Sequence, residues 1–329
     1  MVALTLALAL VGCEKDSGLS SKTSGKLSGA ESSLLADLPG GNVALFGGNY
    51  LKLQDFAQNS AIGRLIGSLQ QVAPGLKEWT ACFVNQRGVQ MMGAVAYADG
   101  ALTMRYVMKG FDVAQIESCA AKAGFRSQVD ADRRFVAIEM PGPLGTSTVG
   151  YLALADGALL TRAAMPIPPA AMLPPPVERA ALEADVAAAA RGNATEDAAL
   201  VAELGRIDRS RAMWFVGDAS DTPIGDKVGL MRGWVDIGGG ISLDVSAQVK
   251  DAAIAEQIAA GVPMAKREAG KLGGEVGNVV RGLRFERKGD RLRFAIKMTD
   301  RQIDALMEQL APFLPRSAGP AGGPVEFDF

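Results

Sequence analysis

The one long apolar run of this chain stands at its beginning, where Val2 to Val11 contain only apolar residues and a single threonine. This is the length of the apolar region of an export signal, and it is too short to span a bilayer as a helix. No later apolar run reaches the roughly 18 residues that a spanning helix needs. We therefore expect the remainder to fold as a separate body, with a core built from short apolar segments.

The apolar run closes on Leu10-Val11-Gly12-Cys13, which resembles the lipobox of bacterial lipoproteins. In that family the signal is cut before the cysteine, and the thiol becomes linked to diacylglycerol. The resemblance implies a signal peptide over residues 1–12 and a lipidated Cys13 that attaches the chain to a membrane. Glu14 in second place resembles lipoproteins sorted to the outer membrane, so we expect the periplasmic side of that membrane rather than the inner one. No Lys or Arg precedes the run, which suggests a translation start upstream of Met1.

The chain contains no histidine, and this excludes more chemistry than any residue that is present. Imidazole-activated nucleophiles, His-ligated zinc and His proton shuttles are all ruled out. Cys82 and Cys119 are the only cysteines besides Cys13, too few for a thiolate zinc site or an iron–sulfur cluster. There is also no phosphate-binding glycine loop and no EF-hand loop. We therefore expect no enzymatic activity, no cofactor and no metal site.

The charge balance argues against a nucleic-acid partner. The 34 basic and 36 acidic residues leave a net charge of −2, which provides no field for steering onto a polyanionic duplex. The expected partners are instead the membrane, through the N-terminal lipid, and an unidentified protein or polymer of the cell envelope.

Shifts in composition divide the chain. Residues 14–33 are rich in Ser, Gly and Lys and nearly free of large apolar groups, as is typical of a flexible tether. Residues 165–176 hold six of the 16 prolines and interrupt the body. The expected units are the signal peptide at 1–12, a lipidated cysteine and tether at 13–33, a first α+β lobe at 34–164, a Pro-rich linker with helices at 165–209, a second α+β lobe at 210–315 and a disordered tail at 316–329.

Short alternating or apolar segments separated by glycine turns predict strands in both lobes. The expected strands are Val43–Phe46, Trp79–Val84, Val89–Tyr97, Leu102–Met108, Phe135–Met140, Val149–Leu154, Ala158–Arg162, Ala212–Val216, Met231–Ile237, Ile241–Val249, Val279–Arg287 and Arg291–Met298.

Helices are predicted where apolar residues recur at a period near 3.6 behind a capping residue. Asp112 with Gln115, Asn193 with Glu196, and Thr299 with Gln302 have the spacing of capping boxes. Asp251 opens a further helix, Val177–Arg191 an Ala-rich one, and Ile62, Leu65, Ile66 and Leu69 share one helical face.

The order strand, hairpin, helix, hairpin, helix occurs twice along the chain. NVALFGGN at 42–49 aligns with RAMWFVGD at 211–218, placing Phe46 beside Phe215, and the helix from Asp112 corresponds to the one from Asp251. We expect two related α+β lobes, each a mostly antiparallel sheet with helices packed on one face, or else two unrelated α+β units. A shared architecture would not name a function.

Two groups of residues are candidates for special roles besides Cys13. Cys82 and Cys119 either form a disulfide in an oxidising envelope or remain as two buried thiols. In the last hairpin, cationic residues alternate with apolar ones, so one face is expected to be cationic. It either contacts anionic lipids or a polyanionic polymer, or is a solvated sheet face. Its members are Arg284, Arg287, Lys288, Arg291, Arg293 and Lys297.

Two weaker patterns have plain structural explanations. A methionine cluster on paired strands suits Cu(I) but is more typical of core packing; it comprises Met91, Met92, Met104 and Met108. Carboxylates at strand ends could hydrolyse glycosides without histidine, although no spacing singles out a pair; they are Glu139, Asp218, Asp236 and Asp244. The favoured function is therefore non-catalytic binding or scaffolding on a lipid anchor. The alternatives are a carrier of an apolar ligand and, less favoured, a His-free carboxylate hydrolase.

Overall fold

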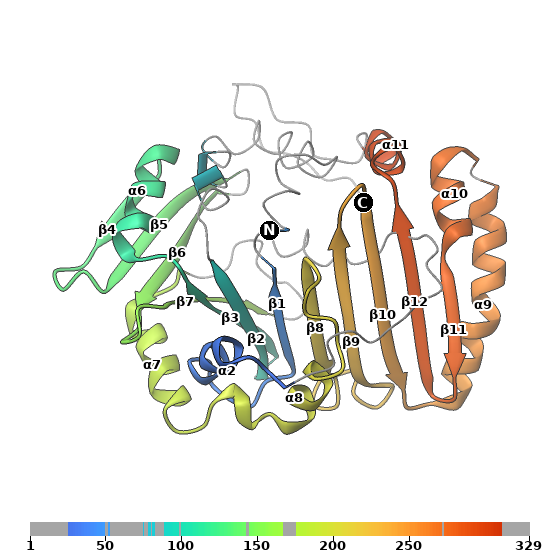
Figure 1. Cartoon of the computed structure of the whole chain (residues 1–329), viewed down its shortest axis with the longest axis horizontal. Coiled ribbons are helices and arrows are strands. Elements are labelled where there is room, and N and C mark those ends of the chain that lie inside the picture. Colours follow the sequence, from blue (N-terminus) through green and yellow to red (C-terminus); the bar gives the residue numbers. More distant parts are fainter. Residues whose placement is uncertain are drawn as a thin grey trace.

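The structure is a computed structural model that describes residues 26–49, 52, 75, 78–79, 81–82, 89–98, 100–142, 145–166, 176–271 and 273–310. Within these ranges the chain forms helices and one large antiparallel sheet, which confirms the α+β class (Figure 1). The strands are β1 Ala44–Gly48, β2 Gln90–Ala98, β3 Ala101–Lys109, β4 Arg126–Val129, β5 Phe135–Gly142, β6 Gly145–Ala153, β7 Leu159–Pro166, β8 Met213–Asp218, β9 Val228–Ile237, β10 Ile241–Val249, β11 Arg284–Lys288 and β12 Arg291–Met298. The helices are α2 Gly29–Ala36, α6 Val113–Ala123, α7 Arg179–Ala189, the 3-10 turn Ala194–Glu196, α8 Ala198–Leu204, α9 Ala252–Gly270, α10 Gly274–Gly282 and α11 Asp300–Leu310.

All of these strands belong to a single sheet, in the order β11-β12-β10-β9-β8-β1-β2-β3-β7-β6-β5-β4. The sequence predicts a separate sheet for each lobe, and the structure differs because the first strands of the two lobes, β1 and β8, pair with each other. Each of these short strands has two edges of backbone donors and acceptors, and the β1–β8 pairing satisfies the edges that two separate sheets would leave open.

The centre of the sheet is built around two phenylalanines that lie directly opposite each other. Phe46 of β1 pairs with Phe215 of β8, and the outward neighbours of these residues are Gly93 on β2 and Gly233 on β9. A Cβ added to Gly93 would lie 2.1 Å from the Phe46 ring, and one added to Gly233 would lie 2.6 Å from the Phe215 ring. Each ring therefore occupies the space that a side chain on the neighbouring strand would need.

One face of the sheet, called here the first face, is covered by α2, α7 and α8. Leu35 of α2, Leu182 of α7 and Leu204 of α8 are fully buried against strand residues such as Leu45 and Val216. Because side chains alternate along a strand, the pairing registers assign Trp214 and Val107 to this same face. This apolar cluster extends across the junction of β1 and β8.

The opposite, second face carries the remaining helices. Ile116 of α6 packs on Ile138 and Tyr151 near one end of the sheet. At the other end, Val279 of α10 and Ile303 of α11 pack on β10 and β12, with α9 beside β11 (Figure 1). The expectation of one covered face in each lobe fits 210–315, where α9, α10 and α11 all pack on the second face. It is wrong for the first lobe, because the strands of that lobe bury two apolar faces, with α2 and α7 on one and α6 on the other.

The capping signals are confirmed. Asp112 and Gln115 form a complete capping box on α6, which ends on Gly124 in the left-handed conformation. Thr299 and Gln302 also bond reciprocally at the start of α11. The box of Asn193 is present but opens the 3-10 turn, and α8 starts after it.

Three local expectations are wrong. Trp79 and Cys82, placed in a strand by their apolar surroundings, have helical backbone. Val279 belongs to α10, so the strand expected from that residue begins at Arg284. The last part of the predicted tether is helical, because Ser28 and Glu31 form a capping box and the leucines that follow are buried.

Other expectations fall outside the described residues. These are the signal peptide, Cys13, the tether before residue 26, the helical face at 62–69, residues 167–175 of the Pro-rich linker and the tail at 316–329.

Candidate functional site

The point where the chain enters the folded body is fixed by one arginine. Arg209 donates from Nη2 to the carbonyl of Lys26 at 3.3 Å, from Nε to Glu31 at 2.8 Å and from Nη1 to the carbonyl of Leu204 at 2.6 Å. Burial alone would raise the pKa of Glu31, but the hydrogen bonds from Arg209 and Ser28 hold it below its usual value. Lys26, the first described residue, therefore lies beside α8, and Leu27 packs against the first-face core.

A hollow of about 580 Å³ opens at the same place, between the entering segment and α8. Leu27 and Val201 provide apolar lining, and Lys26 and Arg206 stand at its margin.

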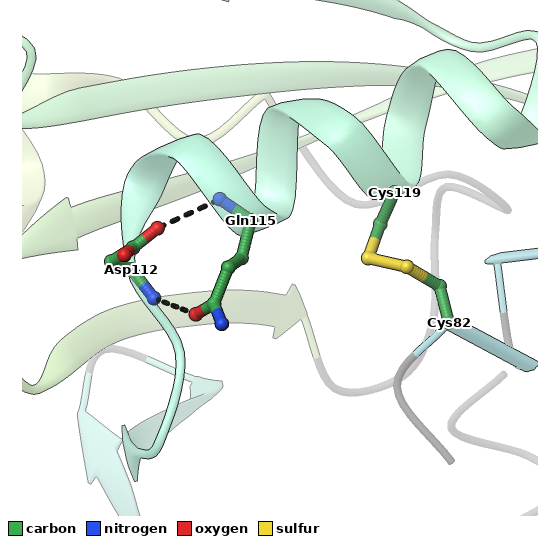
Figure 2. Close-up of a disulfide and its surroundings, with 4 residues drawn as sticks. All are labelled: Cys82, Asp112, Gln115 and Cys119. Carbon is green, nitrogen blue, oxygen red and sulfur yellow. Dashed lines mark hydrogen bonds between the residues drawn. A yellow bond between two sulfur atoms is a disulfide. The ribbon is translucent and has the colours of Figure 1, made fainter. Parts of the chain in front are cut away.

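The structure joins Cys82 and Cys119 in a disulfide, one of the two alternatives left open by the sequence. Cys119 lies on the inward side of α6 and is almost fully buried, and Figure 2 shows its sulfur bonded to that of Cys82, further along the helix than the capping box. The Cα atoms are 5.6 Å apart. This covalent bond attaches the helical segment that contains Cys82 to α6.

Five of the six cationic candidates share one face of the sheet. The registers of β9, β10, β11 and β12 place Arg284, Lys288, Arg291, Arg293 and Lys297 on the first face, in line with Arg232 and Val216. Arg287 is the exception. It pairs with Leu292 on the second face, and its Nε donates to the carbonyl of Gly289.

Arg293 is neutralised within the sheet. Its Nε lies 3.0 and 3.1 Å from the two carboxylate oxygens of Asp244, and Nη1 lies 3.4 Å from Glu286. The hydrogen bond to Asp244 raises the pKa of Arg293 above its usual value. Asp244 is only 9% exposed, so this pair is an integral part of the sheet.

Arg291 shares a buried carboxylate with two other arginines. Glu203 of α8 is 1% exposed and accepts from Arg206 at 2.6 Å and from Arg232 at 2.8 Å, with Arg291 at 3.8 Å. The carboxylate thereby fastens α8 to β9 and borders the cationic strands.

Arg284, Lys288 and Lys297 have no ion-pair partner within the described part of the chain. Arg284 and Lys288 are exposed, and Lys297 is half-buried. Lys288 lies directly opposite Arg291, a placement of like charges that is unfavourable without a counter-ion. These three residues, together with Arg291 and Arg293, are called here the cationic face.

Two of the three buried carboxylates among the described residues were not predicted from the sequence, Glu203 and also Asp185, which packs on the strands of the first half. Asp185 of α7 is 4% exposed and binds Arg105 at 2.8 Å and Arg162 at 3.2 Å. Both buried acids do have a signal in the sequence. Asp185 falls on the apolar stripe of Leu182 and Ala189, and Glu203 falls between Leu200 and Leu204.

The carboxylates considered for hydrolysis are engaged elsewhere. Asp236 accepts from Lys52 at 2.9 Å and Arg211 at 2.7 Å. Burial would raise the pKa of Asp236, but these hydrogen bonds lower it. Asp244 holds Arg293, Asp218 accepts from Ser220 at 3.0 Å, and Glu139 is 4.0 Å from Arg126.

The methionine cluster is divided by the sheet. Met92 is buried on the first face, whereas Met91, Met104 and Met108 lie on the second. Over the residues that the structure describes, no group of three or more His, Cys, Asp or Glu side chains is arranged to hold a metal. None of the described helices is both long and apolar enough to cross a bilayer.

No family model matches the chain, and no curated protein does. Among solved structures the chain is similar to the protein TP0453 in three crystal forms. Form III has a TM-score of 0.46 at 9% identity, covering 84% of this chain and 98% of that one. Forms I and IV have TM-scores of 0.41 and 0.43 at 8% and 9% identity, covering 84% and 85% of this chain and 97% and 99% of the other.

Proposed function

We propose that this protein is a lipid-anchored component of a bacterial cell envelope, held through Cys13 on the periplasmic side of the outer membrane. The support is the lipobox-like Leu10-Val11-Gly12-Cys13 at the end of an export-signal-like run. Lys26, 13 positions after that cysteine, is the first residue that the structure describes, and Arg209 holds its carbonyl beside α8.

The body acts in this proposal as a non-catalytic binding or scaffolding module. The observation that carries it is the cationic face, where Arg284, Lys288 and Lys297 have no ion-pair partner among the described residues. The carboxylates suited to hydrolysis are held in ion pairs or turns instead. A solvent-facing charged sheet offers shape and charge to a partner, and its function depends on binding rather than bond making.

The anchor is tested by replacing Cys13 with serine and fractionating the cells. The parent chain is expected in the membrane fraction and to incorporate radiolabelled palmitate, whereas Cys13→Ser is expected in the soluble fraction without label. The matched control replaces both Cys82 and Cys119 with serine, which removes the other two thiols and should leave the label intact. Unchanged membrane association of Cys13→Ser would refute the anchor.

We also propose that the two halves of the body, 34–164 and 210–315, arose by duplication. Phe46 and Phe215, aligned by sequence, lie opposite each other at the centre of the sheet, and each ring covers a glycine of the next strand outward. The helices α6 and α9 follow corresponding strands, β3 and β10, on the same face. A pseudo-twofold axis between the two phenylalanines would relate these features. Matched substitutions at the two glycines, described below, test this relation.

A further inference from the structure

We propose that the cationic face lies against the anionic lipid headgroups of the membrane that holds Cys13. The proposal rests on the proposed function for the identity of that membrane. It adds to that function the surface of the body that faces the bilayer.

The anchor and the cationic face lie on the same side of the sheet. Leu27 and the leucines of α2 pack into the first-face core, and Lys26 is held against the end of α8 by Arg209. α8 lies over β8, and β11 is four strands further along, about 19 Å at the usual strand spacing. Thirteen residue steps from Cys13 to Lys26 can span at most about 45 Å, so the anchor and this face can reach one plane.

The free cations are spread out rather than convergent. Lys288 and Arg284 lie four residues apart on β11, about 14 Å along the strand, and Lys297 lies on the neighbouring β12. A small anion such as free phosphate requires donors that converge on one point. Separated cations on an open sheet fit a surface that presents many anionic groups side by side.

The wider charge count on this face points the same way. On β9 to β12, first-face positions carry six cations and three carboxylates. The carboxylates Asp236, Asp244 and Glu286 are each already bonded to or beside an arginine. The excess positive charge is therefore left to Arg284, Lys288 and Lys297. The described helices that pack on β11 and β12 are α9, α10 and α11, and they lie on the opposite, second face.

The experiment measures binding of the mature chain from residue 13, carrying Cys13→Ser so that neither a lipid nor the apolar run Val2–Val11 contributes, to vesicles of phosphatidylcholine with and without phosphatidylglycerol. Binding is expected only with phosphatidylglycerol and should weaken with salt. Each cation near an anionic surface contributes about 1 kcal/mol, or about fivefold in affinity. Each of Arg284→Gln, Lys288→Gln and Lys297→Gln should thus lose about fivefold, and the triple variant on the order of a hundredfold.

The matched control is a triple variant with the same charge change on the other side of the sheet, Lys122→Gln, Arg267→Gln and Arg287→Gln. These residues are exposed, and the helices that carry two of them pack on the second face. The control should bind phosphatidylglycerol vesicles within about twofold of the parent. Thermal unfolding of both triples checks that they are folded.

Three outcomes would overturn the proposal. One is equal loss in both triple variants, which would mean that net charge alone matters. Another is equal binding to neutral vesicles, and the third is binding to soluble polyphosphate with no binding to vesicles, which would assign the face to a polymer. None of these outcomes depends on whether Cys13 is lipidated, so this failure is distinguishable from failure of the anchor.

Discussion

Each half of the first face places two cations directly opposite each other on neighbouring strands, and the halves differ in how this repulsion is compensated. In the first half, Arg105 and Arg162 lie directly opposite each other on β3 and β7, and Asp185 of α7 reaches between them. In the second half, Lys288 and Arg291 lie opposite each other on β11 and β12, and Glu203 of α8 reaches Arg291 only at 3.8 Å. A helix covers the first pair, whereas the second remains open to solvent.

The comparison separates a cation used for packing from a cation left available for a partner. The side chains of Arg105 and Arg162 are 14% and 23% exposed, and their ion pairs with Asp185 fix α7 to the sheet. Lys288 is exposed and has no acidic partner among the described residues. Two like charges on neighbouring strands therefore indicate a binding surface only where no other part of the protein covers and neutralises them.

The largest effect should follow from removing the covered carboxylate. Asp185→Asn leaves two arginines in a buried site, and we expect the free energy of unfolding to fall by about 3–5 kcal/mol. Glu203→Gln should cost less, about 1–3 kcal/mol, because Arg206, Arg232 and Arg291 can turn toward water. Urea unfolding of the two variants measures both values. A greater loss for Glu203→Gln would show that the open half is the more tightly packed one.

The disulfide distinguishes the corresponding helices α6 and α9, since only α6 is tied by a covalent bond. The closed loop has a sequence separation of 37, for which chain entropy predicts about 4 kcal/mol of stabilisation. Replacing both Cys82 and Cys119 with serine should lower the free energy of unfolding by about this amount. Reductant should affect the parent chain and leave the serine variant unchanged. A parent chain insensitive to reductant would contradict the bond.

The glycines beside the central phenylalanines test how alike the halves are. Gly93→Ala and Gly233→Ala each place a methyl group in a phenylalanine ring, and we expect each to cost about 1–3 kcal/mol. Gly238→Ala, where nothing lies within 4 Å of the added Cβ, is the control and should be nearly neutral. Thermal unfolding gives the three values. A large cost at only one of the two central glycines would argue against equivalent positions.

The smallest effects should appear in the dependence of stability on pH. Burial and the charge of Asp156 raise the pKa of Asp37 above its ordinary 3.8, so its stability contribution is present at low pH and lost as the pH rises through the raised value. The pKa of Asp236 is instead held low, so its contribution is present above about pH 4 and lost below it. At pH 7 we expect Asp37→Asn to be slightly stabilising and Asp236→Asn to be destabilising, each by about 1 kcal/mol or less because both groups are partly exposed. Denaturant midpoints that shift in the same direction would contradict this assignment.

Local signals in the sequence predict most of the elements. A capping residue and its partner three positions later act within one turn, so Asp112 with Gln115 and Thr299 with Gln302 identify helix starts without knowledge of the fold. The alternation on β12 likewise predicts which of its cations share a face. The alternation of β11 also places Arg287 with Phe285, on the face opposite to Arg284 and Lys288, so including Arg287 among the cations of one face was an error that the sequence itself could have corrected.

Some features of the fold cannot be predicted from local sequence patterns. Short apolar segments such as Trp79–Val84 and the one at Val279 suit a strand or a buried helix equally, and only packing decides between them. The pairing of β1 with β8 joins residues 169 positions apart, and nothing near Phe46 or Phe215 indicates which strand will lie alongside. The cationic face was predicted from its hairpin, but its neighbours on β9 and β10 appear only in the assembled sheet.

The junction of β1 and β8 also sets an order of assembly for the polypeptide. When this chain is synthesised N-terminus first, β1 can pair with β2 early, but the other edge of β1 stays unpaired until about residue 213 has been made. During that interval an apolar strand edge is open to neighbouring molecules, a common starting point for misassembly. The chain is therefore expected to be most prone to aggregation while its second half is still missing.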